Sequence, residues 1–279
     1  MAHQELSPDA GAAASAARRA IMWQLVQFTP AEAPRGVRRA AGLAGRIGFA
    51  AYAWLVLGFL ASLALLAVVL LPGQRRRRAV VYRLDRALIR LTLTPLRVDG
   101  EEHLTLPGAF VIVANHASYL DSFVLAAVIS DRATFVAGEV FATKMLTGFF
   151  LGRLGIEFVE HAKPDGTGGT TPRLAEVARS GTPLVFFPEG GLSSSRGLRP
   201  FHHGAFVVAA GVGCPVVPIA ISGTREMVPP GRRLVRHGRV HLVVGAPLHP
   251  AGSDWDAAVE LGERARAAIA HDTAEPDVS

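Results

Sequence analysis

Residues 110–122, FVIVANHASYLDS, combine an apolar run with the first group of residues in this chain that can carry out chemistry. The first part, 110–114, has the length and apolar composition of a buried strand. Inside one helix, five steps of about 100° would place His116 and Asp121 on different sides of the axis. We therefore expect a turn that carries His116 after the strand, followed by a helix that begins near Ser118.

Asp121 has two roles open to it in this geometry. Its carboxylate can hold the imidazole of His116, fix the tautomer and leave the other ring nitrogen free as a general base. The run Ser118-Tyr119-Leu120-Asp121 also has the pattern of a capping box, in which the carboxylate only caps the helix. The spacing by itself favours the cap, and both roles stay open.

Residues 96–271 alternate short apolar runs with helical segments. This pattern is typical of an α/β domain with a mixed, largely buried sheet flanked by helices. Expected strands span 96–98, 110–114, 134–137, 155–159, 184–187, 216–220 and 240–244. Expected helices span 121–129, 140–151, 171–179, 204–211 and 254–271.

A second signal lies in LVFFPEGGLSSSRGLRPFHHGAF, residues 184–206. Pro188 ends an apolar run and is followed by an acid, Glu189, and two glycines. Loops after strand ends are where α/β folds place ligand groups, although Glu189 alone reads more readily as a turn residue. The third segment, VVPIAISGT at 216–224, reads by itself as a buried strand.

Residues 47–71, IGFAAYAWLVLGFLASLALLAVVLL, form a long stretch without a charge. At about 1.5 Å per residue this helix reaches roughly 37 Å, enough to cross a hydrocarbon core of about 30 Å. The 46 residues before it exceed the short leading region of a cleavable signal peptide. We expect a retained membrane segment that spans the bilayer or forms a hairpin within it; a buried helix of a soluble core is the third alternative.

Arginines flank this segment unequally, with four in the twenty residues before it and seven in the twenty after it. The excess predicts that the following domain lies on the cytoplasmic side of the cytoplasmic membrane. Residues 72–95 read as a basic amphipathic helix with Arg83, Arg86 and Arg90 on one face. This helix either lies on an anionic membrane surface or packs on the domain with a solvated arginine face.

Composition excludes several classes of protein. Half of the 279 residues are hydrophobic and 19% are charged, so the chain is not disordered. The single cysteine, Cys214, allows no intramolecular disulfide, and adjacent His202 and His203 lack a third ligand, so no metal site is expected. The net charge of +6 arises from 27 Arg and 2 Lys. No nucleic-acid partner is expected, because the arginines flank a membrane segment without an aromatic stacking surface.

Three segments, in this order, resemble the glycerophospholipid acyltransferase family, which includes 1-acylglycerol-3-phosphate acyltransferases. The matching blocks are Asn-His-four residues-Asp at Asn115, His116 and Asp121, Phe-Pro-Glu-Gly at 187–190, and Val-Pro-hydrophobic at 217–219. Residues 154–159 and 197–206 are similar to two further family blocks, and the resemblance covers roughly 96–250. It implies a glycerol-3-phosphate acyltransferase-like fold.

The resemblance also implies an activity: transfer of a fatty acyl group from an acyl-CoA or acyl carrier protein thioester to a hydroxyl of a lysophospholipid such as 1-acylglycerol-3-phosphate. His116 would take the hydroxyl proton and Asp121 would orient the imidazole. The residues that would bind substrate are Asn115, His161, Glu189, Gly190, Arg196 and Arg199, with Glu189 and Gly190 at the glycerol part of the acceptor. No metal or redox cofactor is implied.

The chain departs from the family at basic positions that commonly hold an acceptor phosphate. These positions are occupied here by Gly138, His161, Leu192 and His202. Either other cations replace the missing ones, with Arg153, Lys163, Arg196 and Arg199 closest in sequence, or the acceptor is a lysolipid with a different or larger headgroup.

Two other function classes stay open. A hydrolase of thioesters or lipid esters would need an activated nucleophile, but the sequence has no Gly-x-Ser-x-Gly elbow and residues 193–195 lie in a polar loop. A non-catalytic lipid-binding protein could keep the fold. Whatever the function, we expect 1–46 to be a mobile segment, 96–271 to be the catalytic-sized α/β domain and 272–279 to be a polar tail.

Overall fold

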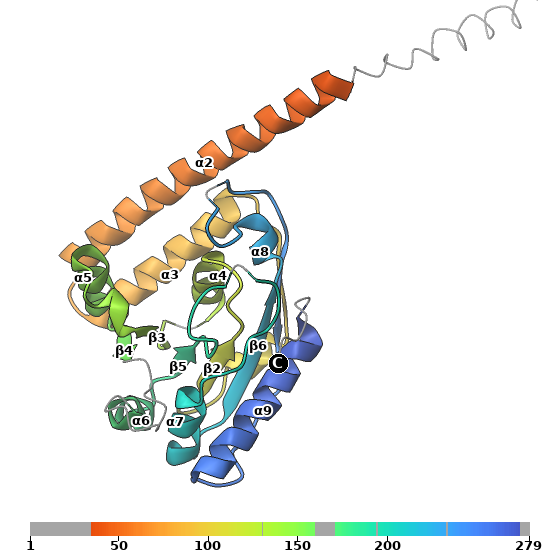
Figure 1. Ribbon diagram of the computed structural model, residues 1–279. Coiled ribbons are helices and arrows are strands. Elements are labelled where there is room, and N and C mark those ends of the chain that lie inside the picture. Colours follow the sequence, from red (N-terminus) through yellow and green to blue (C-terminus); the bar gives the residue numbers. More distant parts are fainter. Residues whose placement is uncertain (1–34, 130, 160–170, 194, 233, 274–279) are drawn as a thin grey trace, which may run out of the picture. The chain divides into compact units, whose positions relative to one another are not determined.

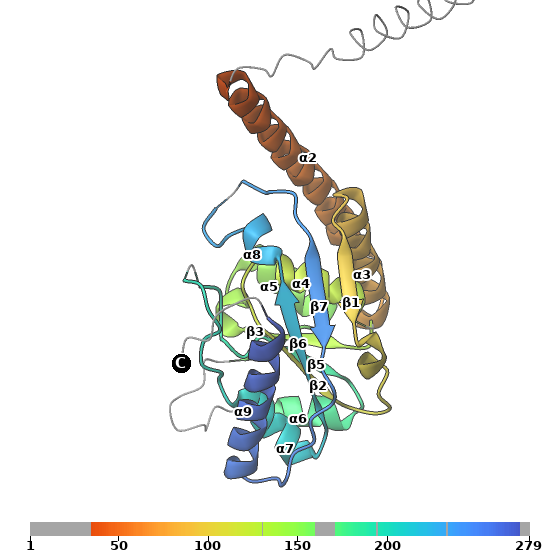
Figure 2. The ribbon, with the colours of Figure 1, turned by 90° about the vertical axis from the view of Figure 1, so that its right-hand side faces the viewer.

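Seven short apolar runs form one mixed sheet in the computed structural model, which describes residues 35–129, 131–159, 171–193, 195–232 and 234–273. The strands are β1 (Leu96–Asp99), β2 (Val111–Ala114), β3 (Thr134–Gly138), β4 (Glu157–Val159), β5 (Leu184–Phe186), β6 (Val216–Ser222) and β7 (Val240–Val244). Their order is β1-β7-β6-β2-β5-β3-β4, and β6 pairs antiparallel with β7 while the other neighbours are parallel (Figure 2). The expected mixed sheet is confirmed.

Helices cover both faces of this sheet (Figure 1). One face carries α3 (Gln74–Leu91), α4 (Leu120–Val128) and α5 (Met145–Leu154); the other carries α6 (Thr171–Arg179), α7 (Gly204–Val212) and α9 (Trp255–Asp272). Short helices η1 (Glu101–Leu104), η2 (Glu139–Phe141) and α8 (Thr224–Met227) lie in the connections. Strand β2 is buried throughout and alternates between two cores: Val111 and Val113 belong to one, Ile112 and Ala114 to the other.

The strand order determines where the polar loops meet. Strand β2 lies between β6 and β5 and is parallel to both. The carboxyl ends of these three strands therefore meet at one edge of the sheet. In α/β folds that edge is where ligands bind.

Residues 35–70 form one continuous helix, α2 (Arg35–Leu70), of which 42–70 is long and apolar enough to cross a membrane. No turn interrupts it, so the hairpin alternative for 47–71 is wrong. The chain divides into two units between Gly45 and Arg46. Within the second unit, the hydroxyl of Tyr52 donates a hydrogen bond to the carbonyl of Leu91 over 2.9 Å, and Val68 is buried in the α3–α4 core. The opposite face of α2 stays exposed.

Helix α3 begins at Gln74, and its apolar face is part of the core through Val81, Tyr82 and Ile89. Arg86 does not lie on a solvated face, because its guanidinium donates to the carbonyls of Ala127 and Ile129 at the end of α4, over 2.6 and 3.4 Å. The buried apolar face of α3 is thus unavailable to lipid.

The helix expected over 140–151 is wrong in its boundaries. A short 3₁₀ helix, η2, ends at Phe141, and α5 begins only at Met145. The Thr143 hydroxyl donates to the carbonyl of Val140 over 3.0 Å and so holds a local turn that competes with helix formation. Helix α5 ends at Leu154 and is followed by Gly155, whose φ is 75°, so that β4 begins only at Glu157.

We predict an unusual pH dependence of stability from Asp85, which is buried on the core face of α3. Burial raises its pKa to about 7, against the opposing charge of Arg86. The folded protein therefore holds a proton that the unfolded chain releases near pH 4, and stability falls as pH rises through 7. Between pH 5 and pH 8 the wild-type protein should lose roughly 2 to 4 kcal/mol of unfolding free energy to this group. Asp85→Asn should not show this loss.

Thermal unfolding of detergent-solubilised protein at both pH values measures this effect. The exposed Asp256→Asn on α9 is the matched control. Parallel curves for wild type and Asp85→Asn at both pH values would contradict the assignment.

Candidate active site

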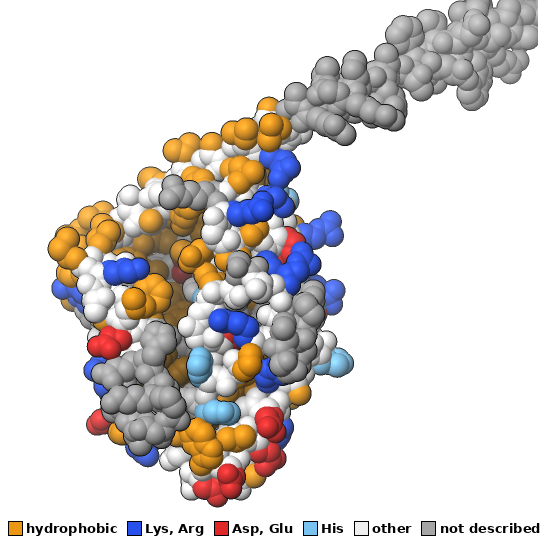
Figure 3. Space-filling model, in the orientation of Figure 1, with side chains coloured by type: hydrophobic (Ala, Val, Ile, Leu, Met, Phe, Trp, Pro, Cys, Tyr) orange, Lys and Arg blue, Asp and Glu red, His pale blue; other side chains and the backbone are white. Residues whose placement is uncertain are grey.

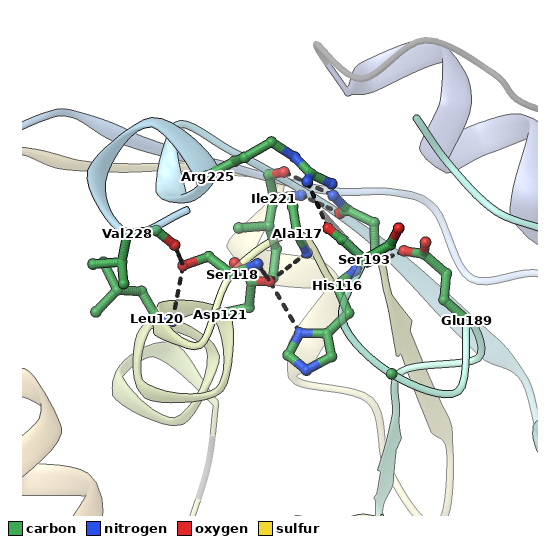
Figure 4. Close-up of polar contacts among 12 residues, drawn as sticks. His116, Ala117, Ser118, Leu120, Asp121, Glu189, Ser193, Ile221, Arg225 and Val228 are labelled. Carbon is green, nitrogen blue, oxygen red and sulfur yellow. Dashed lines mark hydrogen bonds and ion pairs between the residues drawn. The ribbon is translucent and has the colours of Figure 1, made fainter. Parts of the chain in front are cut away.

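The turn between β2 and α4 brings His116 and Asp121 together as the spacing requires. Strand β2 ends at Ala114 and α4 begins at Leu120. Nδ1 of His116 lies 3.0 Å from Oδ2 of Asp121 (Figure 4). A carboxylate oxygen only accepts, so Nδ1 carries a proton, and in the neutral tautomer that fits this contact Nε2 is the nitrogen with the lone pair. The His116 side chain is 15% exposed and that of Asp121 is fully buried, which leaves the imidazole as the accessible member.

The same carboxylate oxygen also caps the turn. Oδ2 of Asp121 accepts hydrogen bonds from the backbone N–H groups of Ala117 and Ser118, over 2.7 and 2.8 Å. Its other oxygen, Oδ1, is buried and has no donor among the described residues. Capping and imidazole orientation, considered above as alternatives, occur together on one atom.

An aromatic ring supports the imidazole from one side. The ring of Phe187 stacks on that of His116 with centroids 4.1 Å apart and planes 18° from parallel, and Phe187 in turn stacks on Phe135. The position of the His116 ring is thus set by the carboxylate at its edge and by Phe187 at its face. The sequence placed Phe187 in a family block but did not identify this contact.

Glu189 joins the His116 turn to the loop after β5. Its Oε1 accepts from the backbone N–H of His116 over 2.7 Å, and its Oε2 accepts from the backbone N–H of Arg199 over 3.2 Å. The Arg199 guanidinium lies 3.5 Å from Oε2 and donates to the carbonyl of Gly191. Only 6% of Glu189 is exposed. In this structure its carboxylate connects two loops of the site.

At Gly190, the residue after Glu189, the structure leaves no room for a side chain. Its φ is 72°, and an added Cβ would lie 2.8 Å from the ring of His202. His202, which stands where the family commonly has a cation, therefore lies directly against the Phe-Pro-Glu-Gly turn.

The other residues expected at the site are placed differently. The Asn115 side chain donates to the carbonyl of Ile221 and accepts from its N–H, over 2.9 and 2.7 Å, so it joins β2 to β6 and is 1% exposed. Arg196 is largely exposed and forms an ion pair with Glu226 at 3.6 Å. His161 and Lys163 lie outside the described residues.

Arg225 was not predicted and lies at the same edge. Its Nη1 donates to the carbonyl of Ser193 over 2.9 Å, and it is only 8% exposed. With Ala117 and Arg196 it lines a small recess. The sheet topology could have indicated this position, because Arg225 follows the carboxyl end of β6 and β6 is parallel to β2. Among the described residues, no three side chains of metal-binding type are grouped.

This strand–turn–helix site lies within a segment, residues 95–222, that matches the acyltransferase family model. A 1-acyl-sn-glycerol-3-phosphate acyltransferase of Brassica napus chloroplasts, BAT2, is 30% identical over 145 residues, which cover 52% of this chain and 42% of the relative. A Saccharomyces cerevisiae protein of the same description is 27% identical over 213 residues, covering 75% of this chain and 70% of the relative. Over residues 95–222 this chain is therefore similar to the acyltransferase family.

The fold also matches that of a solved structure. The crystal structure of PlsC from Thermotoga maritima, described as a 1-acyl-sn-glycerophosphate (LPA) acyltransferase, superposes with a TM-score of 0.64 at 20% identity. The match covers 82% of this chain and 96% of PlsC. The chain spans about half the length of the chloroplast relatives, 42% for BAT2 and 52% for the Arabidopsis thaliana protein LPAT1.

We predict that Asp121 contributes more to stability than His116 does. Asp121→Ala would leave three N–H donors without an acceptor in a buried turn, each costing about 1 to 3 kcal/mol, whereas Asp121→Asn keeps one acceptor oxygen. His116→Ala removes only a partly exposed ring. Chemical unfolding should rank the losses Asp121→Ala, Asp121→Asn, His116→Ala, and equal losses for all three would exclude the capping role.

Proposed function

We propose that this protein is a membrane-associated acyltransferase of phospholipid biosynthesis. It moves a fatty acyl group from an acyl-CoA or acyl carrier protein thioester to a hydroxyl of a lysophospholipid such as 1-acylglycerol-3-phosphate. The single observation that carries the proposal is the 3.0 Å contact between His116 Nδ1 and Asp121 Oδ2 at the carboxyl end of the central strand. This contact supports the tautomer in which Nε2, on the accessible imidazole, can act as the base.

The chemistry requires one well-placed base. An alcohol is a poor nucleophile until its proton is removed as the new C–O bond forms, and such a base contributes about 10² to 10⁴-fold. Nε2 of His116 takes the hydroxyl proton while the oxygen attacks the thioester carbonyl. The C–S bond then breaks, and the imidazolium returns the proton to the leaving thiolate. Asp121 stabilises the imidazolium, and no covalent acyl-enzyme is needed.

Stabilisation of the tetrahedral oxyanion has to come from donors outside the His116 turn. The backbone N–H groups of His116, Ala117 and Ser118 already donate to Glu189 and Asp121. Each would have to break a short hydrogen bond to serve the oxyanion. The loop after β5 is one candidate at Gly191, since the Gly190 N–H already donates to the carbonyl of Phe187 over 3.1 Å.

The headgroup of the acceptor has two candidates. Arg196, Arg199 and Arg225 lie around the site and favour an anionic lysolipid such as lysophosphatidate. A lysolipid with a diester or amino-acid-derived headgroup is favoured by one specific observation: His202, rather than a permanent cation, packs against Gly190. Glu189 and Gly190 would act at the glycerol part through the loop that they hold.

Acyl transfer by the detergent-solubilised protein tests this function. Labelled acyl-CoA and acyl carrier protein are offered with a panel of lysolipids, and His116→Ala should lower transfer by about 10² to 10⁴-fold. His103→Ala, at a histidine in η1 remote from the turn, is the matched control and should keep activity. Release of free acid without an acceptor would indicate a hydrolase instead. Lipid binding without turnover, unaffected by His116→Ala, would indicate a non-catalytic protein.

We further propose that α2 lies within one leaflet instead of crossing the bilayer. Tyr52 and Leu71 are about 28 Å apart along the helix, and both contact α3: the Tyr52 hydroxyl donates to Leu91 and the Leu71 carbonyl accepts from Arg77. A crossing helix would draw α3 into the hydrocarbon with its exposed Arg83 and Arg90, at a cost of several kcal/mol. The arginine excess still favours the cytoplasmic, anionic surface.

This arrangement predicts that both termini are accessible from the same side of the membrane. Epitope tags at the amino and carboxyl ends should both be removed when protease is added to sealed vesicles of one orientation. Detergent-opened vesicles give the control for complete digestion. Protection of one tag with loss of the other would establish a single span.

A further inference from the structure

A second apolar surface lies outside α2. Helix α5 and the preceding η2 expose five large apolar side chains: Val140 (50%), Phe141 (42%), Met145 (91%), Leu146 (65%) and Phe149 (46%). We call these five residues the α5 patch. Scattered exposed apolar residues are ordinary, but five within ten positions, led by an almost fully exposed Met145, form a contiguous surface of the kind that marks an interaction site.

The α5 patch lies between the candidate active site and the end of α2. Segment η2 starts at the carboxyl end of β3, which is parallel to β5 and so ends at the same sheet edge as the Glu189 loop. At its other end, α5 is fixed to α2: the guanidinium of Arg153 donates to the carbonyls of Val68 and Val69, both over 3.1 Å.

The end of α2 continues this apolar surface. Leu66, Val69 and Leu70 are 54%, 48% and 68% exposed. Hydrophobic side chains gather along α2 and on the flank that carries α5 (Figure 3). The α5 patch is therefore continuous with the face of α2 that we assign to the membrane.

Cations accompany the exposed rings. Lys144 Nζ lies 5.6 Å from the ring centroid of Phe141, and the Arg153 guanidinium lies 5.6 Å from that of Phe149. Glu139 is the acidic residue of η2, and α5 has none. Aromatic rings with adjacent cations suit the boundary between acyl chains and anionic headgroups, where the ring is buried and the cation meets phosphate.

We propose that the α5 patch inserts into the headgroup boundary of an anionic bilayer as a second membrane contact, separate from α2. At ten residues, or about 15 Å, α5 is too short to cross the bilayer, so it would lie in the interface. The proposal deepens the proposed function and rests on it: a lysolipid would reach the edge that carries His116 by lateral movement within the leaflet. A stable protein partner would need roughly 20 to 30 residues on each side, well beyond five.

Site-specific fluorescence on the full chain, reconstituted into phosphatidylethanolamine–phosphatidylglycerol vesicles, tests the contact. Cys214 is buried, and burial raises the pKa of its thiol. Cys214→Ser gives a cysteine-free background in which only the introduced thiol is labelled. Met145→Cys, Leu66→Cys and Glu263→Cys are labelled in turn with an environment-sensitive dye. We expect lipids spin-labelled near the headgroup to quench positions 145 and 66, and aqueous iodide to quench the exposed position 263 on α9.

The three positions separate the outcomes. Quenching by lipid at 66 with iodide access at 145 would overturn the α5 contact while α2 stays membrane-bound. Shielding of 145 from both quenchers would indicate a protein partner and would also overturn it. Lipid quenching at neither 66 nor 145 would reject membrane association itself, and with it both proposals.

An activity measurement gives a second readout. The double variant Met145→Asp/Leu146→Asp should lower turnover of a vesicle-borne lysolipid about tenfold, because it removes apolar burial and repels anionic lipid. Turnover of a water-soluble short-chain acceptor should be unchanged. Trp255→Asp, at an exposed aromatic residue on α9, is the matched control. An equal loss with both acceptors would assign the patch to the fold or the site instead of docking.

Discussion

One buried oxygen atom organises the candidate site: Oδ2 of Asp121, which receives the His116 imidazole and two backbone N–H groups. These three donors belong to three consecutive residues, so the chain must curl around the carboxylate. That curl is possible only where a strand has ended and a helix has not yet begun. The four residues between His116 and Asp121 thus reflect the size of a capped turn, and the His116 imidazole is held by the interaction that starts α4.

The parts of the fold that depend on local chemistry were predictable from the sequence. The strand at 110–114, the turn at His116 and the helix after it follow from apolar composition, spacing and capping. The helix at 140–151 was misplaced because apolar content was given more weight than the Thr143 hydroxyl, which bonds back to Val140. The helix expected over 72–95 begins at Gln74, and Arg77 in its first turn donates to the carbonyl of Leu71.

The contacts across strands were not predictable in this way. Asn115 was expected to face substrate, yet it holds Ile221, 106 positions away, through both ends of its amide. The contact between Glu189 and the His116 backbone spans 73 positions. Each depends on the order β6-β2-β5, which no local pattern specifies. The family resemblance pointed to the residues of these blocks. Only the sheet order shows that Asn115 connects two strands and that Glu189 connects two loops.

The shared carboxylate of Glu189 limits how such a site can diversify. One of its oxygens holds the turn that carries His116, and the other holds Arg199 in the loop that contains two of the four departures from the family. A substitution that moves this loop to suit another headgroup would therefore also displace His116. Acceptor preference and catalytic geometry are not independent variables here. Changes in acceptor specificity would have to occur at side chains that do not take part in the Glu189 contacts. Leu192 and His202 are two such side chains.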